Sequence, residues 1–202
     1  MPDTPNPDDK PRPERPARPP AAARPARAPR KPAEMPSEPW AGELPAALQE
    51  RFGDRLSETQ VLGGQKLLVA DIAAALEILT CLKQEHHFDY LVDVTAVHWP
   101  DKQEQFEIVW VLYSFASNQR VRLKAALAEG AAAPSASALY SSANWLEREV
   151  YDMFGIEFQD HPDLRRILMP DEWEGFPLRK EYGIVQQDSD WVRENLKIES
   201  AQ

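Results

Sequence analysis

The 202 residues are enough for one domain with extensions, but the net charge of −10 is unevenly distributed. Residues 1–38 carry a net charge of +2 and the remainder −12, so the body lacks the basic face that binding to nucleic acid requires. The single cysteine, Cys81, excludes a disulfide framework and any all-cysteine metal or iron–sulfur site built by this chain alone.

Residues 1–39 differ in kind from the rest. They hold 13 of the 19 prolines and no Phe, Tyr, Val, Ile or Leu, so they cannot bury enough apolar surface to offset the entropy of ordering. We predict a disordered Pro/Ala/Arg-rich extension over residues 1–38. Its acidic residues and prolines interrupt an amphipathic helix, which makes a mitochondrial transit peptide the less favoured interpretation. No apolar run approaches the ~18–20 residues of a membrane span.

The body begins with a helix and a hairpin. Leu44, Leu48 and Phe52 recur at helical spacing, and Gly53 can end that helix. The stretch TQVLGGQKLLVA then reads as two strands joined by Gly63–Gly64, which supply the positive φ of a tight turn. Asp71 can cap the next helix. The apolar stripe of this second helix consists of Ile72, Ala75, Leu76, Leu79 and Leu82.

Three further strands are expected. FDYLVDVTAVHW and QFEIVWVLYSF are rich in β-branched and aromatic residues, and RVRLKA alternates basic with apolar residues as an edge or half-exposed strand does. With a third helix before residue 155, the pattern predicts a two-layer α+β domain over residues 39–155. We expect a mixed sheet of about five strands and about three helices.

The third helix opens a stretch dense in charge. Asn144 is expected to be its N-cap, Glu147 the reciprocal member of a capping box, and Gly155 its stop. Arg148 and Asp152 stand at i, i+4 spacing, which favours an ion pair.

Residues 156–202 are expected to form an extended C-terminal strap. Three X-Pro steps keep residues 156–182 away from the α conformation, yet the segment is too apolar for a free tail. We expect most of its apolar anchors to lack a regular element of this chain on which to pack. An extended chain with such anchors and charged pairs is suited to wrapping another surface, its own or a partner's.

The stretch NWLEREVYDMFGIEFQDHPDLRRILMPDEWEGFPLRKEY resembles the signature of the 30-kilodalton subunit of respiratory complex I, which in bacteria is the C subunit of NADH-quinone oxidoreductase. The resemblance is specific over this stretch and weaker back to about residue 40. One departure is Glu181, where the family has Asp. The motif residues that the resemblance marks as an interface are Glu147, Arg148, Glu149, Asp152, Gly155, His161, Pro162, Asp163, Arg165, Arg166, Trp173, Glu174, Gly175, Pro177, Arg179 and Lys180.

The resemblance implies a non-catalytic peripheral-arm subunit of a proton-translocating NADH:quinone oxidoreductase. It implies that the chain binds no cofactor or metal itself, and that FMN, iron–sulfur clusters, NADH and quinone are bound by other subunits. The implied partners are the 49-kilodalton-type subunit, which we call the D subunit, and other peripheral-arm subunits. The implied location is the cytoplasmic face of the bacterial inner membrane, with membrane contact only through the complex.

Other functions stay open at this point. The same module could serve a related hydrogenase, an F420H2 dehydrogenase or a plastid-type complex. In a different class, Glu147, Glu149 and Asp152 could hold Mg²⁺ in a phosphoryl-transfer enzyme or nuclease, although no Gly-rich phosphate loop is present. A zinc site at His86, His87, His98 or His161 and a catalytic Cys81 thiol are weaker hypotheses, because neither has the expected spacing or surroundings.

Overall fold

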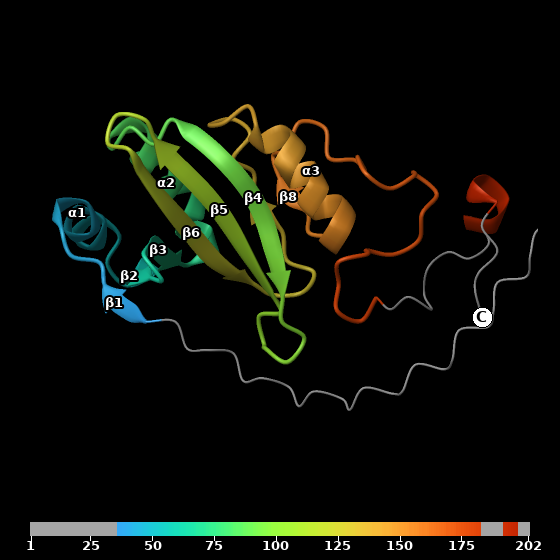
Figure 1. Cartoon of the computed structure of the whole chain (residues 1–202), viewed down its shortest axis with the longest axis horizontal. Helices are drawn as coiled ribbons and strands as arrows, with labels where there is room; N and C mark the ends of the chain where they lie inside the picture. The colour runs from blue at the N-terminus through green and yellow to red at the C-terminus, as the bar shows by residue number, and fades with distance from the viewer. Residues whose placement is uncertain (1–35, 183–191, 198–202) are drawn as a thin grey trace, which may run out of the picture. The chain divides into compact units, whose positions relative to one another are not determined.

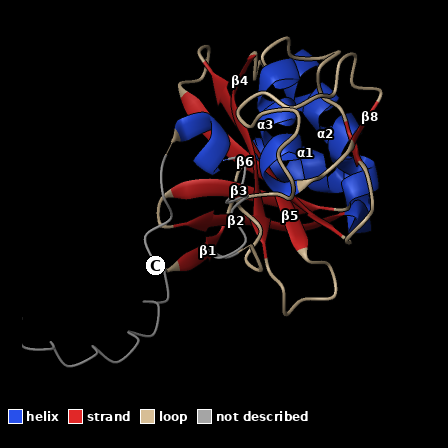
Figure 2. Ribbon diagram, turned by 90° about the vertical axis from the view of Figure 1, so that its right-hand side faces the viewer, coloured by secondary structure: helices blue, strands red, loops and turns tan. Residues whose placement is uncertain are grey.

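The computed structural model describes residues 36–182 and 192–197. Within this part, six strands form one mixed sheet in the order β1-β2-β3-β6-β5-β4. The α-helices lie against one face of the sheet, as the edge-on view in Figure 2 shows. The prediction of a two-layer α+β domain with a mixed sheet is therefore confirmed, with one strand more than expected.

The first half of the domain forms as its sequence pattern predicts. Strand β1 (Ser37–Pro39) pairs with β2 (Leu56–Leu62), so the folded body begins slightly before the expected boundary at residue 39. Helix α1 (Glu43–Phe52) is followed by a short 3-10 helix, η1 (Gly53–Arg55). The hairpin from β2 to β3 (Gln65–Ala70) turns at Gly63 and Gly64, both with positive φ.

Helix α2 (Ile72–Gln84) begins after Asp71, which occupies the N-cap position without a side-chain hydrogen bond to the helix. Strands β4 (Tyr90–His98), β5 (Phe106–Ser114) and β6 (Gln119–Leu127) follow as an antiparallel meander. Of the two interpretations of RVRLKA, the half-exposed strand is confirmed and the edge strand is wrong, because β6 also pairs in parallel with β3 and lies inside the sheet (Figure 1).

The central position of β6 explains its alternating pattern. Val121, Leu123 and Ala125 are fully buried on the face that the helices cover. The intervening basic residues project from the opposite face, which no described helix covers. The sequence signal was that of a strand with one covered face, and such a signal does not distinguish an edge strand from a central one.

Helix α3 (Ala143–Phe154) packs over β4 and carries the first charged residues of the motif stretch. Its N-cap is Ser142, so the assignment of the cap to Asn144 was wrong by two positions. Short strands β7 (Ala133–Pro134) and β8 (Phe158–Gln159) pair in parallel and bring the segment after α3 back to the domain. Val192–Leu196 forms a short π-helix, η3.

Among the described residues, no helix is both long and apolar enough to cross a membrane. The expectation of disorder for residues 1–38 falls almost wholly on residues 1–35, which lie outside the described part. The strap expected over residues 156–202 is described only up to Tyr182 and again over 192–197.

Gly155 ends α3 in the left-handed conformation, with φ of 74°. A Cβ built on it would lie 2.5 Å from Cε2 of Phe176, so the ring packs directly on the glycine backbone. Gly155→Ala should therefore destabilise the domain by more than the ~1–2 kcal/mol of left-handed strain alone. Thermal unfolding measures the difference.

The matched control is Gly130→Ala. Gly130 has nearly the same φ, 75°, but nothing lies within 4 Å of its added Cβ. Equal losses of melting temperature in the two variants would show that Phe176 does not press on Gly155.

Candidate interaction site

The candidate site is formed by α3, its C-cap Gly155 and residues 156–182, which together carry every predicted motif residue. Three charged side chains of α3 are buried: Glu147 and Asp152 are fully inaccessible and Arg148 is 5% exposed. A buried charge is expensive unless hydrogen bonds or an opposite charge compensate it. The hydrogen-bond and ion-pair partners of these three side chains therefore show which segments the site holds together.

Asp152 binds residues 166–169 to α3 through hydrogen bonds. Its Oδ2 accepts hydrogen bonds from three consecutive backbone N–H groups, those of Ile167, Leu168 and Met169, at 3.0, 2.7 and 2.8 Å. Its Oδ1 accepts from Nη1 of Arg166 at 2.6 Å. Burial would raise the pKa of Asp152, but these four donors outweigh it and hold the pKa below its ordinary value.

Arg166 extends this network outward. Besides Asp152, its guanidinium donates to the backbone carbonyl oxygens of Trp173 and Gly175 at 2.9 and 3.1 Å. It also lies 5.4 Å from the ring centroid of Phe176. One arginine thus holds residues 173–176 in place. Trp173 is 8% exposed, and its indole N–H donates to the hydroxyl of Tyr182.

Arg148 binds the same segment one helical turn earlier. Its Nε and Nη2 donate to the carbonyl oxygens of Arg165 and Arg166 at 3.1 and 3.0 Å, and its guanidinium stacks 5.0 Å from the centroid of the Trp145 ring. The predicted i, i+4 ion pair between Arg148 and Asp152 does not appear among the described contacts. Each of the two side chains contacts residues 165–169 instead.

Glu147 turns away from its own helix terminus. Its carboxylate accepts from the hydroxyl of Ser135 and the backbone N–H of Ala136, both at 2.7 Å. The capping-box role was therefore wrong, since these donors belong to the segment after β7. Burial raises the pKa of Glu147 to about 7 despite both hydrogen bonds.

His161 lies beside Glu147, with its Nε2 4.0 Å from Oε2 of the carboxylate. The backbone N–H of Asp163 donates to its Nδ1, so Nε2 carries the proton and donates to the carbonyl oxygen of Asn144 at 3.0 Å. The imidazole thus joins the start of α3 to the segment that follows β8.

Residues 178 and 179, near the end of the segment, form hydrogen bonds with the last turn of α3. The N–H of Leu178 donates to the carbonyl oxygen of Met153, and Nε of Arg179 donates to that of Phe154 at 2.6 Å. Arg179 also pairs with Glu129 at 3.0 Å. Lys180 contributes its backbone N–H to Nδ1 of His98, while its side chain is exposed.

These contacts correct one expectation. Residues 156–182 were expected to lack own-chain structure on which to pack, yet backbone and side-chain hydrogen bonds tie them to α3 and β4. The remaining predicted residues are less buried. Exposed are Glu149, Pro162, Asp163, Arg165, Glu174 and Gly175, whereas Gly155 and Pro177 are half-buried.

The Mg²⁺ and zinc hypotheses receive no support from the geometry. Glu147 and Asp152 are engaged by separate sets of donors, and Glu149 is exposed. In residues 36–182 and 192–197, the one group with metal-ligand spacing is Cys81, Glu85 and His86. The guanidinium of Arg51 already bonds both Cys81 and Glu85, which places a positive charge where a cation would bind.

Sequence reasoning missed three members of the site. Ser135 and Ala136 compensate Glu147, and His98 receives the backbone of Lys180, yet all three lie outside the motif stretch. The only signal was indirect: an acidic residue on a helix with no basic side chain at a suitable spacing needs donors from elsewhere.

The fold and site define a class of protein: a two-layer α+β domain in which buried charges of α3 hold the extended segment of residues 156–182 against the domain. Residues 68–188 match the family described as respiratory-chain NADH dehydrogenase, 30 Kd subunit. The chain belongs to this family.

Relatives agree with that membership. The chain is 42% identical to the NADH-quinone oxidoreductase C subunit of Citrifermentans bemidjiense, over 70% of this chain and 88% of that protein. It is 42% identical to the same protein of Rhodobacter capsulatus, over 75% and 78% of the two chains. The family is thus that of a subunit of an oxidoreductase complex.

Two solved structures resemble the fold. The trypsin-resistant fragment (1-134) of Nqo5 is 29% identical with a TM-score of 0.54, covering 60% of this chain and 98% of that one. A chain of the membrane-bound sulfane sulfur reductase, an archaeal respiratory membrane complex, has a TM-score of 0.63 over 77% of this chain and 90% of its own length. At 22% identity, the second likeness is one of fold alone.

Asp152→Asn should release the segment from α3, because it removes the charge that Arg166 and three N–H groups share. Leaving a buried partner uncompensated costs ~3–5 kcal/mol. We expect a loss of that size in the free energy of unfolding, with faster hydrogen exchange at Ile167, Leu168 and Met169.

Asp163→Asn is the matched control, since the side chains of the Asp163–Arg165 pair are 54% and 68% exposed. Surface pairs of this kind contribute ~0–1 kcal/mol. Similar losses in the two variants would contradict the anchoring role of Asp152.

Glu147 should make stability fall as pH rises. Its pKa is about 7 in the folded chain against an ordinary value of 4.5, so the folded state binds the proton more tightly. The protonated carboxyl group contributes ~3 kcal/mol to the free energy of unfolding. This contribution is fully present below pH ~4.5 and is lost as the pH rises through about 7. Denaturant unfolding from pH 4.5 to 8 measures this change.

Glu147→Gln keeps the shape and an acceptor for Ala136 but cannot titrate. The difference between the two pH profiles isolates Glu147 from other titrating groups. If the free energy of unfolding changed with pH by the same amount in both proteins, the Glu147 carboxyl group would not be the source of the pH dependence.

Proposed function

We propose that this chain is a peripheral-arm subunit of a proton-translocating NADH:quinone oxidoreductase and has no catalytic site of its own. On this proposal it docks on the D subunit of that complex through α3 and the segment that follows it. The NADH-quinone oxidoreductase relatives, 39–42% identical, favour this complex over a hydrogenase, an F420H2 dehydrogenase or a plastid-type complex.

An iron–sulfur cluster does not fit the residues of this chain. An iron–sulfur cluster is held by several cysteine thiolates, commonly four, and the sequence has one cysteine. Burial raises the pKa of the Cys81 thiol, which further disfavours a thiolate there. In this proposal, other subunits hold the iron–sulfur clusters and also bind FMN, NADH and quinone. The contribution of this chain is to bind and position its neighbours.

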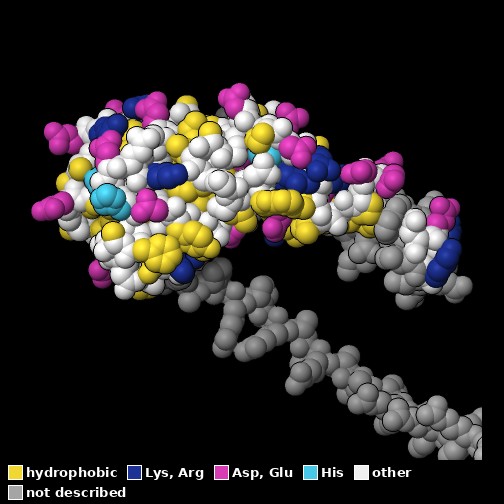
Figure 3. Space-filling view, turned by 90° about the horizontal axis from the view of Figure 1, so that it is seen from above, with side chains coloured by type: hydrophobic (Ala, Val, Ile, Leu, Met, Phe, Trp, Pro, Cys, Tyr) yellow, Lys and Arg dark blue, Asp and Glu magenta, His cyan; other side chains and the backbone are white. Residues whose placement is uncertain are grey.

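The observation that carries the proposal is an exposed apolar surface on the charged motif. Trp145, Leu168 and Leu178 are 59%, 60% and 50% exposed. Figure 3 shows hydrophobic side chains exposed between basic and acidic ones on the view from above. Large apolar side chains beside arginine are typical of the energetic centre of a protein interface.

The buried charges explain how this surface is held in shape. Asp152, Arg148 and Arg166 direct their hydrogen bonds to backbone groups of residues 165–175, so the exposed side chains are carried on an ordered scaffold. Pre-organisation of this kind lowers the entropy that binding would otherwise have to overcome. In the proposed setting the chain reaches the cytoplasmic face of the bacterial inner membrane only through the complex.

The test is assembly with the D subunit. Trp145→Ala combined with Leu168→Ser should reduce co-purification of that subunit at least about tenfold, because truncating a central interface side chain commonly costs ~2 kcal/mol or more. The melting temperature of the free chain should change little, since both side chains are exposed.

Trp99→Ala provides the control, because Trp99 is also exposed, at 43%, but lies in the loop between β4 and β5. Normal assembly of the double variant, or equal loss in the control, would refute docking through this surface.

A further inference from the structure

A second surface lies at the other end of the sheet. The segment after α3 contacts the end of β4, where Lys180 bonds His98. The opposite end is marked by the pairing of Tyr90 with Tyr113. Strand β4 runs from Tyr90 to His98, so its two ends are roughly 25 Å apart at ~3.3 Å per residue.

Three aromatic side chains cluster at this far end. Phe115 is 72% exposed and Tyr90 is 49% exposed. The ring centroids of Tyr90 and Phe115 are 5.9 Å apart, and those of Tyr113 and Phe115 are 4.9 Å apart. The rings thus stabilise one another while keeping most of the Phe115 ring in solvent. An exposed, mutually packed aromatic group is unusual on a surface that has no partner.

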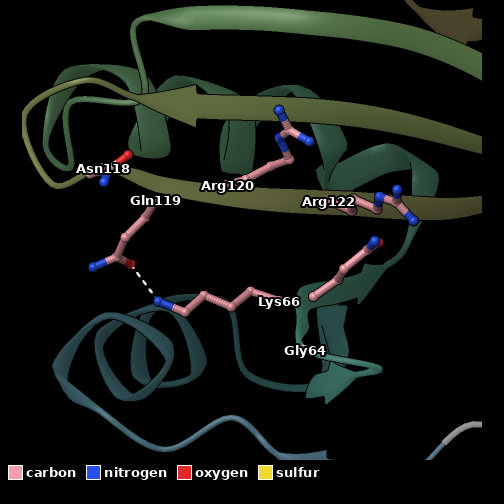
Figure 4. A pocket seen from close by; sticks show the side chains of 7 residues that line it. Gly64, Lys66, Asn118, Gln119, Arg120 and Arg122 are labelled. Carbon is pink, nitrogen blue, oxygen red and sulfur yellow. Dashed lines mark hydrogen bonds between the residues drawn. The ribbon is translucent and has the colours of Figure 1, made fainter.

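A basic pocket of about 240 Å³ adjoins the rings. It lies between the β2–β3 hairpin turn and the start of β6. Figure 4 shows Arg120 and Arg122 on one strand, with Arg120 pointing over the neighbouring strand and Lys66 pointing toward Gln119. Lys66 adds a third cation and donates to Gln119 at 2.6 Å. No acidic residue is among the described side chains that line it. Arg120 is directly opposite Tyr113 in the β5–β6 ladder, so rings and pocket form one continuous surface.

Arg120 and Arg122 differ from most other arginines in the described residues. Arg51, Arg55, Lys124, Arg165, Arg166 and Arg179 each have a carboxylate partner. No carboxylate is paired with Arg120 or Arg122 within residues 36–182 and 192–197. The Nε of Arg122 is moreover buried without a hydrogen-bond partner in that part of the chain. A buried guanidinium N–H without an acceptor is unfavourable, and an incoming oxyanion would supply one.

A second hollow of about 230 Å³ continues from the pocket. Gln65 and Arg122 line both, and Leu62 and Leu67 give the second an apolar floor. Arg122 therefore stands between a cationic pocket and an apolar one.

From this juxtaposition we infer that the surface of Tyr90, Tyr113, Phe115, Lys66, Arg120 and Arg122 docks an acidic segment of another subunit. Carboxylates of that segment pair with Arg120 and Arg122, and an apolar side chain packs on Phe115. The inference rests on the chain being one subunit of an assembly, but it does not depend on the surface of α3. A polypeptide is favoured over nucleic acid because Leu62 and Leu67 in the second hollow suit an aliphatic side chain and not a phosphate.

The experiment places a photo-crosslinking benzoylphenylalanine at position 115 of the full chain, within the purified intact complex. After irradiation, mass spectrometry identifies the attached peptide. We expect one peptide of another subunit, with Asp or Glu next to an apolar residue. The double variant Arg120→Glu, Arg122→Glu should reduce that crosslink at least tenfold and release the captured subunit at lower NaCl concentration.

Arg55→Glu is the matched control, since Arg55 is the last residue of η1, just before β2 and away from the pocket, and its pair with Glu77 is exposed. Circular dichroism of each free chain verifies folding. No crosslink from position 115, an unchanged crosslink in the double variant, or attachment to lipid, nucleic acid or a second copy of this chain would overturn the inference. The Trp145/Leu168 variant should leave this crosslink unchanged whenever the complex forms, which separates the two surfaces.

Discussion

The organisation of the second half of this chain depends on a single carboxylate, that of Asp152. A fully buried carboxylate must be compensated, and here three successive N–H groups and Arg166 do so at once. These contacts fix the course of residues 166–169 on α3. Arg166 is then held where its remaining N–H groups bind the carbonyl oxygens of Trp173 and Gly175. The chain returns to place Phe176 on Gly155 and to cover the last carbonyl oxygens of the helix.

This arrangement resolves why so much charge accompanies so many large apolar side chains. The buried charges are compensated by backbone and side-chain groups of the same chain, so they organise an extended segment that has almost no regular secondary structure. Apolar side chains such as Trp145 and Leu168 remain exposed on that scaffold. A rigid support under an exposed apolar surface suits a subunit that joins others, and the described residues of the motif offer no ligand set for the redox groups of an oxidoreductase complex.

Local patterns predicted most of the elements correctly. The helix of Leu44, Leu48 and Phe52, the Gly63–Gly64 hairpin and the long strands all follow from periodicity and turn chemistry, which act within a few residues. The predictions were wrong where several local structures suited the sequence equally well and contacts with distant residues selected one of them. Asn144 is as good a cap as Ser142 by residue type, and Glu147 stands at capping-box spacing, but its carboxylate is drawn to Ser135 and Ala136, which the fold brings beneath α3.

The sequence by itself determined that the body is a two-layer α+β domain, that a single cysteine cannot hold a cluster, and that the motif belongs to a subunit family. These conclusions need only composition, periodicity and a specific run of residues. Tertiary structure alone decided that β6 lies inside the sheet, that Asp152 collects three N–H groups from residues 167–169, and that Tyr113 stands beside Arg120. The reason is physical: strand order and the pairing of buried charges depend on which distant segments meet when the core closes, and residue spacing along the chain does not encode that directly.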